Sequence, residues 1–206
     1  MKTILITRPN YDIPTRYFYY WNKEVIDLAK KQGLEVIDLK VERANHKDFK
    51  KEIRKNPFLV ILNGQRSEKG ISGFRGEVLL ECGEEGLFKS KIVCSFLSDS
   101  MKKLGMKSIK SGAVAFIGYD DNFVFLCRPK IKTSPLLDET AHPFLDPLRS
   151  LAIDLLSRKN PDQSTEKARK AFKAALKRLS ERDKFSAPFI LWDMNHLKLV
   201  KKQRIE

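Results

Sequence analysis

Short apolar runs alternate, along the first part of the chain, with longer segments whose apolar residues recur at helical spacing. The runs at 3–7, 34–39 and 58–62 predict buried strands. The periodic segments at 17–32 and 46–55 predict helices between these strands. Strands that alternate with helices imply parallel strands joined by right-handed crossovers, so we expect helices on both faces of the sheet.

The middle of the chain predicts additions to this sheet. Glycines punctuate the residues at 70–81, which predicts a small hairpin at the sheet edge. The apolar run at 91–96 predicts another buried strand, and a serine or an aspartate just after it can cap a following helix. The runs at 113–117 and 123–127 flank a polar turn, so we expect a strand, a turn and a further strand there.

The C-terminal part of the chain predicts helices and one more pair of strands. A proline-rich connection leads to helices at 148–158 and 165–182, and the second helix carries an apolar stripe that is typical of core packing. Two final apolar runs, at 188–192 and 196–200, flank a short polar segment. These runs predict a terminal hairpin.

Together the elements predict an α/β fold of the three-layer sandwich type, with a mostly parallel central sheet, helices on both of its faces and hairpins at its edges. We expect one domain at 1–206, with the sheet and its helices in 1–126 and the connection, two helices and the terminal hairpin in 127–206. Hydrophobic residues make up 42% of the chain. No apolar run approaches the ~20 residues of a membrane span, and the first one is too short for a signal peptide. We therefore expect a cytoplasmic protein with no membrane partner.

The charge balance is strongly basic, because 40 lysines and arginines face 26 acidic residues and give a net charge of +14. The residues at 158–206 hold 14 basic and 6 acidic side chains, so this segment supplies +8 of the total. A basic surface attracts the phosphates of nucleic acid. Lysines along one side of a helix are, however, typical of a solvated face. We therefore rank a nucleic-acid-associated module behind the two interpretations given below and do not expect nucleic acid as a partner.

The cysteines do not indicate a metal centre or a disulfide framework. Cys82, Cys94 and Cys127 are odd in number and lack the spacing of metal ligands. We expect free thiols, no metal and no cofactor.

Two of the buried strands end in small polar clusters. The strand at 58–62 stops at Asn63-Gly64-Gln65-Arg66, and the strand at 92–96 is followed by Ser98-Asp99-Ser100. Parallel strands of one sheet end at the same carboxyl edge, where open α/β sheets bind their ligands. This edge is the predicted functional site.

Most of the residues at 1–126 resemble the caspase-like cysteine peptidase clan, which includes gingipain-type proteins. The resemblance rests on the strand that ends in Asn63-Gly64, the hairpin after it, the strand that runs into Ser98-Asp99-Ser100, and the glycine-bounded segment at 112–119. In that clan a histidine follows the Asn-Gly pair and acts as the general base, and the strand after the hairpin ends in the nucleophilic cysteine. The resemblance therefore implies a caspase-like fold.

The chemistry of that clan is not expected here. The histidine position falls on Gln65, the glycine after it on Arg66, and the cysteine on Ser98. A glutamine amide cannot take a proton from a serine hydroxyl near neutral pH. The positions that match the clan are Gly64, Ser100 and Gly105.

We therefore expect an inactive peptidase-like scaffold that binds a peptide, a protein or a small ester-like ligand at the sheet edge. Gly64, Arg66 and Asp99 are expected at the rim of this site, where Arg66 adds positive charge. Asp120 and Asp121 follow another strand and could line a pocket for a basic group, although turn residues are the plainer interpretation.

A serine hydrolase is the alternative, either divergent or engineered. Ser98 stands at the expected start of a helix, where backbone N–H groups and the helix dipole can stabilise an oxyanion. His142 lies in a predicted loop that could fold over the carboxyl edge and serve as the base. The orienting carboxylate of such a triad would come from Asp138, Glu139 or Asp146.

Overall fold

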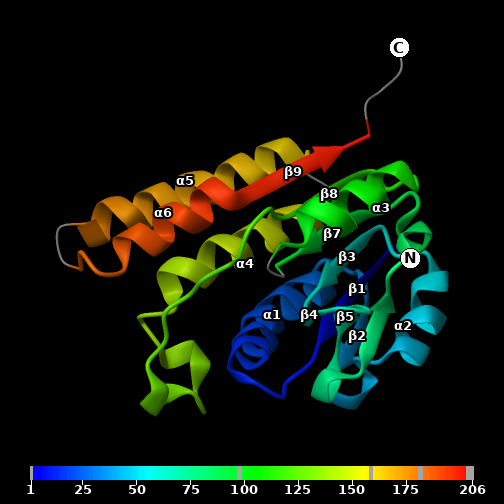
Figure 1. Cartoon of the computed structure of the whole chain (residues 1–206), viewed down its shortest axis with the longest axis horizontal. Coiled ribbons are helices and arrows are strands. Elements are labelled where there is room, and N and C mark those ends of the chain that lie inside the picture. The colour runs from blue at the N-terminus through cyan, green and yellow to red at the C-terminus, as the bar shows by residue number, and fades with distance from the viewer. Residues whose placement is uncertain (1, 97–98, 158–159, 181–182, 203–206) are drawn as a thin grey trace.

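The computed structural model describes residues 2–96, 99–157, 160–180 and 183–202, and it has an α/β fold built on a six-stranded mixed sheet (Figure 1). The strand order is β2-β1-β3-β7-β8-β9. Five strands run parallel, and β9 pairs antiparallel with β8 at one edge. The strands are β1 (Thr3–Arg8), β2 (Glu35–Lys40), β3 (Leu59–Leu62), β7 (Ile92–Ser95), β8 (Ala115–Tyr119) and β9 (Leu197–Lys201).

A second, three-stranded antiparallel sheet lies between β3 and β7 in the sequence. It consists of β4 (Gln65–Ser67), β5 (Gly70–Ser72) and β6 (Val78–Glu81), in that order. The hairpin expected at 70–81 corresponds to the β5–β6 pair. The sequence did not predict β4, which is separated from the end of β3 by two residues, Asn63 and Gly64, and pairs with β5 instead of extending the large sheet.

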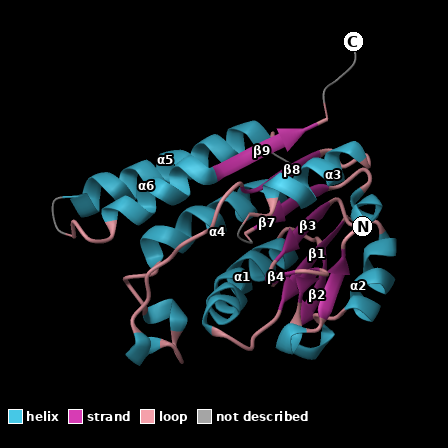
Figure 2. Cartoon of the chain, viewed as in Figure 1, coloured by secondary structure: helices cyan, strands magenta, loops and turns pink. Residues whose placement is uncertain are grey.

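Six α-helices, together with several short helical turns, complete the described part of the chain (Figure 2). The α-helices are α1 (Ile13–Lys31), α2 (His46–Glu52), α3 (Met106–Lys110), α4 (His142–Leu156), α5 (Pro161–Ser180) and α6 (Ala187–His196). Single 3-10 turns lie at Val41–Arg43, Ile53–Lys55, Phe74–Gly76, Glu85–Phe88, Pro129–Ile131 and Pro135–Leu137, and a π-helical turn at Met101–Gly105 runs directly into α3. No helix among the described residues is long and apolar enough to cross a membrane.

The apolar core divides into two clusters because successive side chains of a strand point to opposite faces of the sheet. Ile4 and Ile6 of β1 belong to the cluster that includes the buried faces of α1, α4 and α5. Leu5, which lies between them, belongs to the cluster that includes Phe49 of α2 and Phe88. Every residue of β1 is buried, which explains why three apolar residues, Ile4, Leu5 and Ile6, follow one another along this strand.

The strand expected at 123–127 is not formed. Phe123 and Phe125 pack against aromatic rings of α1 and β8, and the Val124 N–H donates to the side chain of Asp193 at 3.0 Å. The edge of β8 that this segment would need is occupied by β9. The alternating apolar residues therefore pack against α1 and against Tyr119 of β8 without forming a strand of the sheet.

The prediction of a terminal hairpin is also wrong. Residues 188–192 lie in α6, and only the second of the two predicted strands is formed, as β9. A helix buries Ile190 and Asp193 one turn apart on the same side, which a strand at the edge of the sheet would not do. The helix expected from residue 148 begins earlier, at His142, and it accommodates Pro143 in its first turn and Pro147 in its interior.

Candidate functional site

A cleft of about 740 Å³ opens between the three-stranded sheet and the turn that follows β7. One wall of the cleft is formed by β4–β6 and the residues just after β6. The other wall is formed by the segment from residue 99 to residue 107. The pairing of β3 with β7 brings these walls together, since Leu62 and Ser95 are register partners at the carboxyl ends of the two strands. The lining includes Arg66, Ile71, Leu80, Asp99, Lys103 and Lys107.

An ion pair joins the two walls of the cleft. The guanidinium of Arg66, on β4, donates to the carboxylate of Asp99, and Lys102 Nζ lies 3.4 Å from the other carboxylate oxygen. The Asp99 N–H donates to the carbonyl oxygen of Asp121 at 2.9 Å, which ties this segment to the end of β8. Asp99 has a φ of 52°, in the left-handed region that aspartate tolerates better than most residues. The positive charge that the sequence predicted at this edge is therefore balanced by Asp99.

The cleft combines an apolar floor with charges of both signs. Ile71 and Leu80 are buried beneath it, and Leu104 is half-buried beside them. Lys103 and Lys107 lie on the wall after β7, where Lys107 Nζ is 3.8 Å from the carboxylate of Glu85. This lining suits a ligand with an apolar part and its own polar groups, more than it suits a simple anion.

Gln65, where the resemblance places the histidine of the clan, takes part in a structural hydrogen bond. The side-chain amide of Gln65 donates to Asp12 Oδ2 at 2.9 Å, and the backbone carbonyl oxygen of Gln65 accepts from Ser72 Oγ at 3.2 Å. Asp12 uses its other oxygen to cap α1, where it accepts from the Thr15 N–H at 2.8 Å. Gln65 therefore links β4 to the start of α1 and is not among the residues that line the cleft.

The two residues before Gln65 are fixed by close contacts. Asn63 is buried, and it donates from its backbone N–H to Thr7 Oγ1 at 2.7 Å and from its side chain to the Thr7 carbonyl at 2.8 Å. Gly64 has no room for a side chain, because an added Cβ would lie 2.3 Å from the carbonyl oxygen of Ser72. Steric crowding thus explains the glycine after Asn63.

Ser98 lies outside the residues that the structure describes, so its pairing with a base stays a prediction. His142, the base proposed for it, begins α4 and has both ring nitrogens in use. Its Nδ1 lies 2.9 Å from Asp146 Oδ2, and its Nε2 lies 3.1 Å from the carbonyl oxygen of Leu136. A carbonyl oxygen only accepts hydrogen bonds, so Nε2 carries a proton in this arrangement and has no lone pair for a serine hydroxyl.

The other two carboxylates considered for His142 lie elsewhere. Asp138 is fully buried and accepts from Tyr17 Oη at 2.6 Å and from the Arg128 N–H at 2.7 Å. Glu139 is exposed. Of the three candidate orienting residues, Asp146 is therefore the one that contacts His142.

Asp120 and Asp121 do not line the cleft. Asp120 Oδ1 lies 2.7 Å from His196 Nδ1, and the other oxygen lies 3.6 Å from Lys198 Nζ. Partial burial raises the pKa of Asp120, but the hydrogen bond from His196 and the charge of Lys198 outweigh it and lower the pKa below its ordinary value. Asp121 accepts a hydrogen bond from the N–H of the next residue at 2.7 Å, as turn aspartates do.

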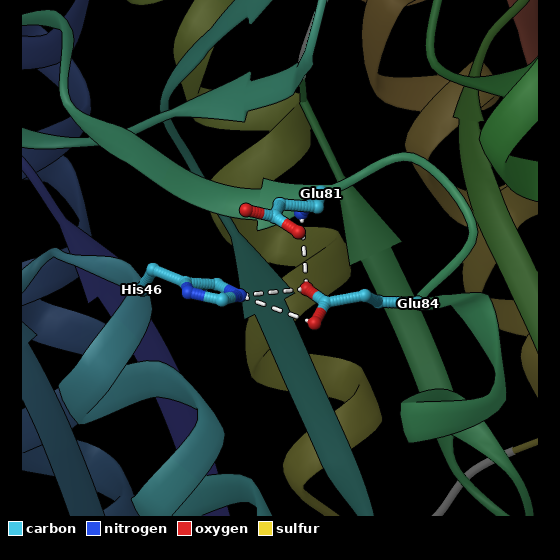
Figure 3. A group of neighbouring side chains, drawn as sticks. All are labelled: His46, Glu81 and Glu84. Carbon is cyan, nitrogen blue, oxygen red and sulfur yellow. Dashed lines mark hydrogen bonds and ion pairs between the residues drawn. The ribbon is translucent and has the colours of Figure 1, made fainter.

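A second group of polar side chains lies at the start of α2, where His46, Glu81 and Glu84 place possible metal-ligand atoms within 4.8 Å of one another (Figure 3). His46 Nε2 is 2.9 Å from one oxygen of Glu84, and Lys50 Nζ is 2.7 Å from the other. Partial burial raises the pKa of Glu84, but the bonds from Lys50, the Glu81 backbone and His46 outweigh it and lower the pKa to about 2. A metal ion would have to displace Lys50, so the group is better explained as the link between α2 and the turn after β6.

No sequence pattern predicted this group, because its members come from different elements and have no motif spacing. Among the cysteines, Cys94 is buried and burial raises the pKa of its thiol, whereas Cys82 is exposed at the cleft.

Comparison of the sequence with protein-family models and with curated proteins found no match to either. The chemistry of the site therefore rests on its own residues.

Proposed function

We propose that this protein is a caspase-like scaffold, with the three-layer arrangement of that clan, which lacks the peptidase dyad and binds a peptide segment of a partner protein in the cleft between β4–β6 and the turn after β7. The scaffold part of the proposal is supported by the resemblance of residues 1–126 and by the adjacency of β3 and β7. The observation that carries the binding part is the lining of the cleft, in which a buried apolar floor lies beneath charged side chains of both signs.

The absence of peptidase chemistry is supported by the partners of Gln65 and by the lining itself. The Gln65 amide is already bonded to Asp12, and an amide is not a base at neutral pH. The chain has three histidines, and none of them is among the described residues that line the cleft. A binding site needs no general base, so these facts favour recognition over hydrolysis.

A peptide is the ligand class that fits this lining best. Ile71 and Leu80 can cover one apolar side chain, while Lys103 on the wall can pair with a carboxylate of the ligand. Lys103 forms no ion pair with another described residue, so its charge is available to a ligand. Arg66 and Asp99 already neutralise each other, and they would fix the width of the cleft instead of selecting the charge of the ligand.

Peptide selection tests this proposal. Peptides enriched from a random displayed library on the purified protein would be labelled, and their affinities measured by fluorescence anisotropy. Lys103→Glu should weaken their binding about tenfold, which corresponds to about 1.4 kcal/mol. Lys110→Glu is the matched control, because Lys110 is exposed on α3 outside the cleft and undergoes the same change of charge.

Equal effects of the two substitutions, or no enriched peptide, would contradict the binding proposal. A fluorophosphonate adduct on Ser98 that Ser98→Ala abolishes would contradict the claim of inactivity and favour the serine hydrolase. The two parts of the proposal can therefore fail separately.

A further inference from the structure

A groove of about 430 Å³ lies where α5 runs beside the junction of α6 and β9, on elements that the cleft does not use. Figure 1 shows α5 and α6 side by side, with β9 continuing from α6. Four cationic side chains line the groove, three from α5 and one from β9. They are Arg169, Lys170, Lys173 and Lys198, accompanied by Glu166, Met194 and Asn195.

Half of the cations in the groove have no ion-pair partner among the described residues. Lys170 and Lys173 form no ion pair with another described residue, and Glu166 is the one carboxylate among the described lining residues. Glu166 lies 3.8 Å from Arg169, at the limit of an ion pair. Lys198 lies 3.6 Å from the carboxylate of Asp120. Two lysines without an ion pair to a described residue, Lys170 and Lys173, therefore lie beside two cations whose carboxylate partners are 3.6–3.8 Å away.

The groove is also held in shape by its own residues. Arg169 donates from its guanidinium to the carbonyl oxygen of Leu197 at 2.7 Å, which ties α5 to the start of β9. Lys198 Nζ donates to the carbonyl oxygen of Asn195 at 2.7 Å, at the end of α6. Cations from two elements are thus fixed around one groove, whereas the sequence indicated only the solvated face of a helix.

We infer that this groove binds the phosphate backbone of nucleic acid without regard to sequence. Lysines presented as point charges neutralise phosphates and release the counterions of the backbone. Among the described lining residues, Met194 is the one apolar side chain, whereas protein interfaces are enriched in aromatic anchors. The exposed rings of Phe185 and Trp192 do not line the groove. The lining therefore favours a polyanion over an acidic protein surface.

The salt dependence of binding tests this inference. A fluorescein-labelled single-stranded RNA of mixed sequence would be titrated with the full chain at several salt concentrations, and anisotropy recorded. With four cations engaged, the slope of log K against log salt should be about −3. The Lys170→Ala, Lys173→Ala double variant should bind about tenfold more weakly and lose about 1.4 from the magnitude of that slope. Alanine is the best helix former, so α5 should stay folded.

The matched control is the Lys130→Ala, Lys132→Ala double variant, which removes the same charge from exposed positions near the turn Pro129–Ile131. Figure 1 places that turn far from β9, and the control should leave the affinity unchanged. Equal weakening by the two double variants would overturn the inference in favour of a general effect of net charge. Polyglutamate that competes as well as unlabelled RNA would overturn it in favour of an acidic protein partner, and a flat salt response would exclude backbone binding.

Discussion

Gln65 donates a hydrogen bond from its side-chain amide to Asp12 Oδ2 at 2.9 Å, and this bond connects the first residue of β4 to the cap of α1. The same carboxylate accepts from the Thr15 N–H at 2.8 Å through its other oxygen. One aspartate thus holds a helix start and the strand that forms the outer wall of the cleft. The position where the resemblance places a general base has a structural role in this chain.

Removal of the shared carboxylate should therefore destabilise the fold. Asp12→Ala loses the helix cap and the bond to Gln65, so the free energy of unfolding should fall by about 1–2 kcal/mol. Urea denaturation followed by circular dichroism measures this change. Asp27→Ala, at an exposed position of the same helix, should change stability by less than about 0.5 kcal/mol, and a similar loss in both variants would contradict the capping role.

Gly64 should be intolerant of even one methyl group. An added Cβ would lie 2.3 Å from the Ser72 carbonyl oxygen, so Gly64→Ala should destabilise the protein by about 1–3 kcal/mol. Gly86→Ala is the control, because no atom lies within 4 Å of a Cβ built there. Thermal unfolding of the two variants measures the difference, and equal midpoints would mean that β4 and β5 can separate at no cost.

Asp193 should make the protein less stable as the pH rises. Burial raises the pKa of this carboxyl from 3.8 to about 8, against a hydrogen bond from the Val124 N–H that lowers it. The folded state therefore holds a proton that the unfolded state has lost, and the free energy of unfolding falls between pH about 4 and about 8.

Asp193→Asn keeps an acceptor for the Val124 N–H and removes this titration. The variant should gain stability relative to the wild type as the pH rises through that range. Urea midpoints of both proteins at a series of pH values measure this difference in stability. A difference in stability between the two proteins that stays constant with pH would show that Asp193 is charged in the folded protein.

Glu84 should act in the opposite direction. Its pKa is lowered from 4.5 to about 2, so its contribution to stability is present above pH about 4.5 and is lost as the pH falls toward 2. Glu84→Gln should therefore be less stable than the wild type at neutral pH and should approach it in acid. The free energy of unfolding of both proteins, measured as the pH is lowered, tests this convergence. Parallel curves of stability against pH would mean that Lys50 and His46 do not stabilise the carboxylate.

The sequence predicted most of the large sheet because burial on both faces leaves continuous apolar runs, as in Ile4–Ile6 of β1 and in all of β3. It also predicted that the ends of β3 and β7 share one edge, which follows from parallel pairing alone. It failed at 123–127 and 188–192, where alternating or continuous apolar residues fit a strand and a helix-packed segment equally well.

The side-chain partners at the edge could not be predicted in the same way. The bond between Gln65 and Asp12 and the pair of Arg66 with Asp99 connect residues far apart in the sequence, so their formation depends on how β4 folds back. The position of His142 on α4, with both nitrogens bonded, likewise depends on tertiary packing that starts the helix before Pro143.

The measurement that most directly tests the proposed scaffold is alkylation at position 98 after the dyad is rebuilt. We would compare Ser98→Cys alone with the same substitution combined with Gln65→His and Arg66→Gly, and follow labelling by a peptidyl fluoromethylketone with peptide mass mapping. A caspase-like edge predicts labelling at position 98 at least about tenfold faster in the triple variant, because a positioned imidazole takes the thiol proton. Equal rates in the two variants would contradict the caspase-like arrangement of this edge.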